Sequence, residues 1–160
     1  MHVLFPGSFD PPTLGHLALL RRAAALFDRV TVGIFINPDK SYLFTPEERR
    51  EMIRLATADL PSVFVDVDSG YVADYCKRNE IPLLIRGIRG DGDLPFEKMA
   101  EEYNRARGIE TLFFFSDPTL SDVSSTEVRR RIREGEELSS IVPAEILPIL
   151  RQKQKDLRAE

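Results

Sequence analysis

Cysteine is almost absent from this 160-residue sequence, which contains only Cys76. A single thiol cannot form an internal disulfide, and no second cysteine or histidine lies at metal-ligand spacing from it, so we interpret Cys76 as a buried or half-buried helix residue. The sequence also lacks an apolar run near the ~20 residues of a membrane span, and its start lacks the basic and apolar regions of a secretory signal. These absences predict a cytoplasmic protein with no membrane partner.

Excess basic charge is absent too, because 22 Lys and Arg residues stand against 26 Asp and Glu residues, for a net charge of −4. Nucleic acids and anionic membranes favour a basic surface through counterion release, so this balance argues against both as partners. The P-loop, the glycine-rich dinucleotide loop and the nucleophile elbow are missing, which argues against kinase, dehydrogenase and hydrolase templates. An anionic ligand would therefore need a local cluster of donors.

The pattern that is present alternates short β-branched or aromatic runs with longer helical segments, which is typical of βαβ units in a parallel sheet. We predict one domain over residues 1–160 with an α/β fold: a Rossmann-like, doubly wound, five-stranded parallel sheet with helices on both faces and a C-terminal helix. The predicted strands span 2–5, 30–36, 63–67, 83–85 and 111–115. The predicted helices span 17–27, 46–58, 71–79, 97–107 and 124–135, and a last one begins at Pro143.

Ligands of such sheets bind beyond the carboxyl ends of the strands, so the loops after the first, second, fourth and fifth strands are the candidate site. The first loop, FPGSFDPPTLGH, leads into a helix whose N-terminal N–H groups suit a phosphate. Gly7 would let the backbone approach a ligand, Ser8 adds a hydroxyl, and His16 adds a ring N–H without a permanent charge. Taken alone, this stretch is better explained as a simple turn with a surface or capping histidine.

The loops after the second and fourth strands carry cations. Lys40 is either a phosphate ligand or one of many solvated lysines, and on its own the solvated interpretation is favoured. Arg86 and Arg89 lie in the stretch RGIRG, where two guanidinium groups could hold phosphate oxygens. Ion pairs of these arginines with Asp91 or Asp93 are the alternative, but such pairs do not explain why glycines lie between and after the arginines.

The stretch SDVSSTEVR at 121–129 brings hydroxyls and N–H groups to a second helix start. A capping box from Ser124 to Glu127 would explain this stretch without any ligand. Only the joint appearance of four such loops at neighbouring strand ends favours a phosphate site.

GSFDPPTLGH and SSTEVR together resemble the signature stretches of the cytidylyltransferase-like nucleotidyltransferases. Within that group the chain is most similar to the phosphopantetheine adenylyltransferases, through four stretches that span nearly its whole length. These are residues 6–16, Pro38-x-Lys40 with residues 44–49, residues 84–89, and Asn104-Arg105.

The resemblance implies transfer of the adenylyl group of ATP to the phosphate of 4′-phosphopantetheine, giving dephospho-coenzyme A and pyrophosphate, with Mg2+ as cofactor. It also implies a homohexamer and makes coenzyme A a candidate feedback ligand. A phosphate monoester is already anionic at neutral pH, so this reaction needs positioning and charge neutralisation rather than a general base.

The same resemblance assigns roles to individual residues. His16, Lys40 and Arg89 would be catalytic, and Mg2+ would be carried by the ATP phosphates rather than by a protein metal site. The residues implied for the acceptor are Ser8, Lys40, Val72 and Arg86. The residues implied for ATP are Ser8, Phe9, His16, Gly87, Ile88, Arg89, Glu97, Leu120, Ser121, Asp122, Val123, Ser124, Ser125 and Thr126.

The stretch Asp93-Leu94-Pro95-Phe96-Glu97 departs from the DFEYE form usual in that family. Pro95 predicts a helix that restarts one turn later, and Phe96 lacks a tyrosine hydroxyl. Two alternatives therefore stay open. One is a related enzyme with another acceptor or nucleotide, such as a nicotinate-mononucleotide adenylyltransferase or a cytidylyltransferase. The other is a catalytically silent nucleotide-binding module.

Overall fold

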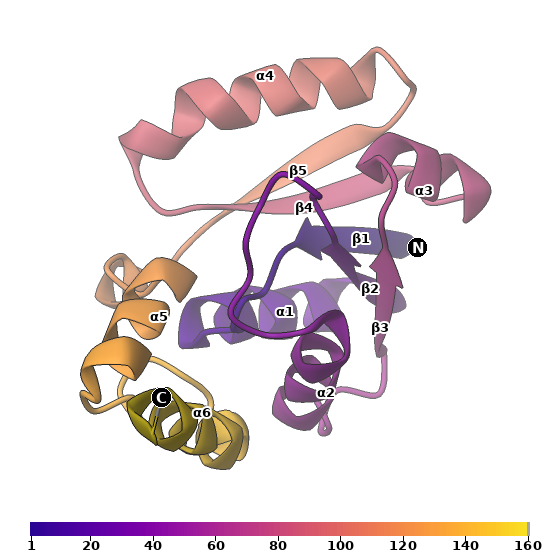
Figure 1. The fold of residues 1–160 in the computed structure, drawn as a ribbon. Coiled ribbons are helices and arrows are strands. Elements are labelled where there is room, and N and C mark those ends of the chain that lie inside the picture. Colours follow the sequence, from indigo (N-terminus) through magenta and orange to yellow (C-terminus); the bar gives the residue numbers. More distant parts are fainter. Residues whose placement is uncertain (160) are drawn as a thin grey trace.

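A five-stranded, all-parallel sheet forms the centre of the computed structural model, which describes residues 1–159 (Figure 1). The strand order is β3-β2-β1-β4-β5, the order of a doubly wound sheet. The strands are β1 (His2–Gly7), β2 (Arg29–Phe35), β3 (Val63–Asp68), β4 (Leu83–Ile88) and β5 (Glu110–Phe115). The predicted fold class is confirmed, but β4 runs three residues further than predicted, because Arg86, Gly87 and Ile88 pair with β5.

Helices cover both faces of the sheet, with α1 and α2 on one side and α3 and α4 on the other (Figure 1). The helices are α1 (Leu14–Leu26), α2 (Pro46–Ala56), α3 (Val72–Arg78), α4 (Leu94–Arg105), α5 (Ser125–Glu134) and α6 (Leu147–Ala159). Short 3-10 turns precede α4, α5 and α6, at Asp91–Asp93, Pro118–Leu120 and Ala144–Ile146. None of the helices within residues 1–159 is both long and apolar enough to cross a membrane.

The alternation of side chains along β1 explains this layering. Val3 and Phe5 pack on one face with Leu20 of α1, whereas Leu4 points to the other face and packs with Cys76 of α3. Cys76 is fully buried, as predicted. A further apolar cluster joins α2, α5 and α6 around Ile132. The central strands are thus buried on both faces.

Two helices begin earlier than predicted. The α1 helix starts at Leu14 rather than at residue 17, because Thr13 is its N-cap and accepts the backbone N–H of His16 at 3.3 Å. The α4 helix starts at Leu94, so the predicted restart at residue 97 is wrong. Pro95 lies in the first turn of α4. Backbone N–H groups in the first turn have no partner within the helix, so a proline there costs no helical hydrogen bond.

The order of the strands brings the loop after β1 next to the end of β4. From β1 the chain moves outward to β2 and β3, and it then crosses back to β4 and moves outward to β5 on the other side. The strand order therefore reverses between β1 and β4. The loop after β1 and the end of β4 lie side by side there, at the carboxyl edge where open α/β sheets bind ligands.

A substitution at Gly87 of β4 tests how closely α1 packs on the sheet. A Cβ atom at position 87 would overlap Leu19 Cδ1, so the Leu19 side chain, which is 5% exposed and packs in the core, would have to shift. We expect Gly87→Ala to lower the free energy of unfolding in urea by about 1–3 kcal/mol. Gly90→Ala is the matched control, since a Cβ there meets no atom within 4 Å. Equal losses in the two variants would contradict this packing.

Candidate functional site

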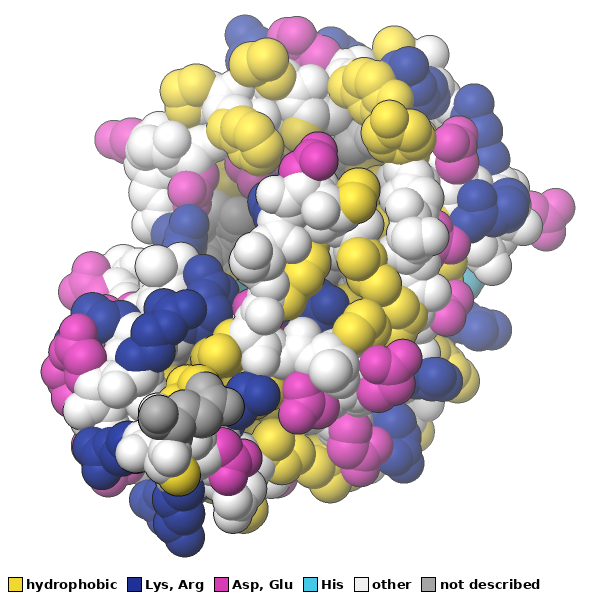
Figure 2. Space-filling model, viewed as in Figure 1, with side chains coloured by type: hydrophobic (Ala, Val, Ile, Leu, Met, Phe, Trp, Pro, Cys, Tyr) yellow, Lys and Arg dark blue, Asp and Glu magenta, His cyan; other side chains and the backbone are white. Residues whose placement is uncertain are grey.

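A cleft of about 320 Å³ opens at the carboxyl ends of β1 and β4. Its walls come from the β1–α1 loop, the end of β4 with the turn that follows, and the N-terminus of α5. Figure 2 shows a recess between the α4 side and the α5 side of the molecule, with Lys and Arg side chains gathered on the α5 rim. The predicted site residues that line the cleft are Phe9, His16, Arg86, Gly87, Arg89, Glu97, Leu120, Val123, Ser124, Ser125 and Thr126.

Six other predicted site residues do not line this cleft, and one of them, Val72, lines a second cleft described below. Ser8 is half-buried in the β1–α1 loop, and Lys40 is exposed on the loop between β2 and α2. Ile88 is buried within the sheet, while Ser121 and Asp122 are exposed in the turn before α5. The structure therefore brings together the two helix N-termini and the arginines, and it leaves the lysine outside.

His16 is held by the bonds that start α1. Its Nδ1 accepts the backbone N–H of Thr13 at 3.1 Å, and the Thr13 hydroxyl accepts the backbone N–H of His16, which makes a reciprocal capping box. A backbone N–H can only donate, so Nδ1 carries the lone pair and the proton of the neutral ring is on Nε2. His16 is thus a capping residue whose Nε2–H remains for a ligand in the cleft.

The imidazole of His16 is uncharged at neutral pH. Burial of the ring and, to a lesser extent, the charge of Arg89 lower the pKa of His16 from 6.5 to about 4. The rings of Phe9 and Phe5 contribute to the burial, with centroids 4.9 and 6.4 Å from the imidazole. The ring therefore offers a directed hydrogen bond without adding a permanent charge.

Phe9 takes an unusual backbone conformation beside the cleft. Its φ is 49°, in the left-handed region that bulky residues avoid, and its ring is buried. The ring lies over Gly7, where a Cβ atom would be 3.0 Å from Phe9 Cε2 and Cζ. Gly7 lines the cleft, where we predicted that it lets the backbone approach a ligand, and its missing Cβ also leaves room for the Phe9 ring. Close packing at Gly7 is thus part of what allows the strained turn.

The two arginines of the RGIRG stretch are each bound to a carboxylate. Arg86 donates from Nε and Nη2 to the two carboxylate oxygens of Glu97 at 2.8 and 2.7 Å, and its Nη1 reaches the carbonyl of Pro6 at 3.4 Å. Asp93 accepts the backbone N–H of Arg89 at 3.0 Å and its guanidinium at 3.4 Å. The ion-pair alternative therefore holds for Arg89, and Glu97, which we predicted on ATP, is bound to Arg86.

The N-terminus of α5 faces the first loop. Ser124 caps the helix by accepting the backbone N–H of Glu127 at 3.1 Å, and the Ser125 hydroxyl donates to the carbonyl of Pro11 at 2.8 Å. The predicted capping box is only half formed, because the Glu127 carboxylate accepts from Arg130 instead of reaching back to the cap. The first-turn N–H groups of α5 lie at the cleft, as do those of α1.

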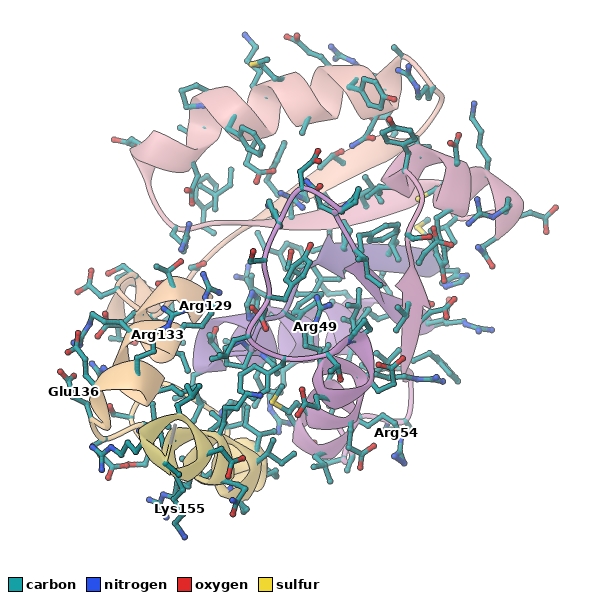
Figure 3. The ribbon with its side chains drawn as sticks, viewed as in Figure 1. Arg49, Arg54, Arg129, Arg133, Glu136 and Lys155 are labelled. Carbon is teal, nitrogen blue, oxygen red and sulfur yellow. The ribbon has the colours of Figure 1, made fainter. Side chains whose placement is uncertain are left out.

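Asp10 is a buried residue beside the cleft that the sequence analysis missed. Its carboxylate accepts the backbone N–H groups of Leu43 at 2.8 Å and Phe44 at 2.9 Å. Arg129 Nη1 donates to the Asp10 carbonyl at 2.7 Å and lies 3.8 Å from the carboxylate. Figure 3 shows Arg129 on the side of α5 towards the central loops. Asp10 thus joins the β1–α1 loop to the β2–α2 loop and to α5, and its sequence signal was its place in the GSFDPPTLGH stretch.

A second cleft of about 300 Å³ adjoins the first, and Arg86 and Glu97 line both. It lies between α3 and α4, is mostly apolar, and includes Val72, one of the predicted acceptor residues. Besides Arg86 and Glu97, its polar lining includes Glu101, the buried Asn104 and the Thr111 hydroxyl oxygen, which is buried without a hydrogen-bond partner in the described part of the chain. The two clefts together suit a long ligand with an anionic end.

The comparisons with known proteins show the family of the chain. A family model described as cytidylyltransferase-like matches residues 4–131, so the fold and cleft are those of a cytidylyltransferase-like nucleotidyltransferase. The phosphopantetheine adenylyltransferase of Streptomyces coelicolor is 40% identical over 149 residues, covering 92% of this chain and 94% of that protein. That of Kocuria rhizophila is 41% identical, covering 91% and 94%. The chain belongs to the phosphopantetheine adenylyltransferase family, which confirms the predicted family and enzyme class.

A solved structure shows the same fold. The bifunctional NMN adenylyltransferase/ADP ribose pyrophosphatase from Francisella tularensis superposes with a TM-score of 0.74 at 18% identity. The match covers 99% of this chain and 52% of that one, so the chain spans about half of the bifunctional protein. At this identity the likeness concerns the fold alone.

The neutral state of His16 can be tested by NMR. The sequence holds two histidines, so His2→Gln leaves a single imidazole to follow. We expect the His16 ring to titrate near pH 4, because burial and Arg89 lower its pKa to about 4. Protonation then favours the unfolded chain, so the contribution of His16 to stability is complete above pH 6.5 and falls as the pH drops towards 4. A midpoint near 6.5 would contradict the buried, neutral ring.

Proposed function

We propose that the protein transfers the adenylyl group of ATP to the phosphate of 4′-phosphopantetheine, giving dephospho-coenzyme A and pyrophosphate. The observation that carries the proposal is the junction of the two clefts at Arg86 and Glu97. The first cleft offers phosphate donors, and the second offers an apolar channel with isolated polar groups. This pair suits an acceptor with a phosphate at one end and a neutral amide arm. The 40% identity to proteins named for this acceptor supports the same assignment.

The acceptor itself supplies the nucleophile. A phosphate oxygen of phosphopantetheine attacks the α-phosphorus of ATP, the bond from that phosphorus to the bridging oxygen breaks, and pyrophosphate leaves with the bonding electron pair. The attacking phosphate is already ionised at neutral pH, so no general base is needed. The work of the protein is to align the three reacting atoms and to balance the developing charge.

His16 is the donor we assign to the ATP phosphates. Its Nδ1 is fixed by the backbone of Thr13, so Nε2–H is presented in a single tautomer and orientation. The N-termini of α1 and α5 add oriented N–H groups on two sides of the cleft. Arg89 supplies a full positive charge at the same cleft, where ATP phosphates would compete with Asp93 for its guanidinium.

Arg86 and Lys40 are assigned to the acceptor phosphate. Arg86 lies at the junction of the two clefts, and its bidentate pair with Glu97 fixes the plane of its guanidinium. Lys40 lies outside the first cleft, but its loop is tied to the cleft by Asp10. A long lysine side chain would reach the acceptor phosphate from that loop.

Mg2+ would enter this site bound to the phosphates of ATP rather than to protein side chains. No group of three His, Cys, Asp or Glu side chains within residues 1–159 is arranged to hold a metal ion. The cleft carboxylates of Asp93 and Glu97 are bound by arginines, so neither is assigned as a ligand. Phosphate oxygens and water are ligands that Mg2+ prefers, and the ion would neutralise phosphate charge when bound with ATP.

The assembly, location and regulation are further parts of the proposal: a homohexamer, the cytoplasm, and coenzyme A as a feedback ligand. Apolar side chains gather over α4 in Figure 2, where Phe96 and Met99 are each 70% exposed and Tyr103 is 46% exposed. Exposed large apolar side chains gathered in one patch favour self-association. Light scattering tests the assembly, and a monomeric mass would overturn it.

An acceptor screen tests the proposed reaction. Purified protein, ATP and Mg2+ are incubated with phosphopantetheine or with nicotinate mononucleotide, and a third reaction replaces ATP with CTP. We expect pyrophosphate release and an adenylylated product with phosphopantetheine alone. Turnover only with the other acceptor, or only with CTP, would assign a related enzyme. No turnover but measurable ATP binding would assign a silent nucleotide-binding module.

Replacement of His16 tests its role in the transition state. His16→Asn keeps an oxygen that can accept the Thr13 N–H and removes Nε2–H, so the helix cap is retained. We expect kcat to fall by about 10²–10³-fold, while the Kd for ATP rises only a few-fold, because the donor acts mainly in the transition state. His2→Ala is the control and should keep full activity. A matching loss in ATP binding with unchanged kcat would contradict the assignment.

A further inference from the structure

Arg49 of α2 has no part in the reaction described above, and yet it is completely buried, with 0% exposure. It is a large side chain with a permanent charge, and burial lowers its pKa while the negative charge of Asp10 opposes that shift. Burying a charge is unfavourable unless its hydrogen bonds are made inside the protein. The contacts of Arg49 therefore show what its burial achieves.

These contacts join two loops. Arg49 Nη1 donates to the carbonyl of Ser8 at 2.9 Å, on the β1–α1 loop that leads to His16 in the first turn of α1. The guanidinium also lies over the ring of Tyr42, with its central carbon 4.2 Å from the ring centroid, and Tyr42 belongs to the β2–α2 loop. Figure 3 shows Arg49 inside the curve of that loop.

The hydroxyl of Tyr42 extends this chain of contacts to the segment that carries Lys40. It accepts the backbone N–H of Asn37 at 2.8 Å and lies 3.4 Å from the Asn37 carbonyl. The same carbonyl accepts the backbone N–H of Lys40 at 3.1 Å. Residues 37–42 are thus closed into one turn, and this turn rests on Arg49 through the Tyr42 ring.

We propose that Arg49 is a positioning residue that sets the Lys40 turn against the Ser8 and His16 loop. A planar guanidinium can donate at one edge to Ser8 while its face stacks on Tyr42, and a lysine cannot do both. Arg49 acts on the acceptor phosphate only through Lys40 and Ser8. The kinetic part of this inference rests on the proposed function, whereas the order of the turn does not.

Two variants and one control test the proposal. Arg49→Lys keeps the charge and loses the planar donor, whereas Tyr42→Phe keeps the ring over Arg49 and loses only the hydroxyl that holds Asn37. Arg50→Lys, on the next and exposed residue, is the matched control. Each protein is assayed with ATP and phosphopantetheine varied separately, and amide hydrogen exchange is followed over residues 36–44.

We expect Arg49→Lys and Tyr42→Phe to raise the KM for phosphopantetheine by about tenfold, to change the KM for ATP by less than about threefold, and to speed exchange at the Lys40 turn. A merely structural role would change both KM values together.

If Arg49→Lys fails to fold, the results for Tyr42→Phe alone test the proposal. Should the wild type be inactive on phosphopantetheine, the proposed function fails, and exchange still tests the turn. Unchanged exchange in Tyr42→Phe overturns the positioning role.

Discussion

The buried carboxylate of Asp10 is the contact on which the rest of the site depends. It accepts two backbone N–H groups from Leu43 and Phe44, and it faces the guanidinium of Arg129. These partners belong to the β2–α2 loop and to α5, more than 30 and 100 residues further along the chain. A charge-assisted bond to buried N–H groups is strong enough to bring them together.

Electrostatic preorganisation explains why the proposed reaction needs no general base or protein nucleophile in this cleft. The proposed nucleophile is an ionised phosphate, so the protein supplies alignment and positive potential rather than a base. In the proposed reaction His16 contributes as a neutral donor, because its Nδ1 is bound by Thr13 and partial burial lowers the pKa of its ring. Arg86 and Arg89 are kept in place by the carboxylates of Glu97 and Asp93. The charged side chains and the helix N-termini of the cleft are thus held in position without a ligand.

The sequence predicted features that depend on local pattern and missed those that depend on distant partners. The strands followed from apolar runs, and the α2 helix followed from the capping box at Thr45. The family followed from motifs that are unusual in combination. The pairing of Arg86 with Glu97, the burial of Arg49 and the bonds of Asp10 could not be read locally, because each partner lies on another element. Motif spacing shows which residue types are present, and the fold decides what they contact.

The most direct test of the central role of Asp10 is amide hydrogen exchange at Leu43 and Phe44 in Asp10→Ala, compared with the wild type under conditions where both are folded. Loss of the carboxylate removes the acceptor of both N–H groups. Exchange at these two amides should therefore rise by about tenfold or more, while the amides of β1 and β4 keep their protection. Unchanged protection at Leu43 and Phe44 would contradict the role assigned to Asp10 in holding the site together.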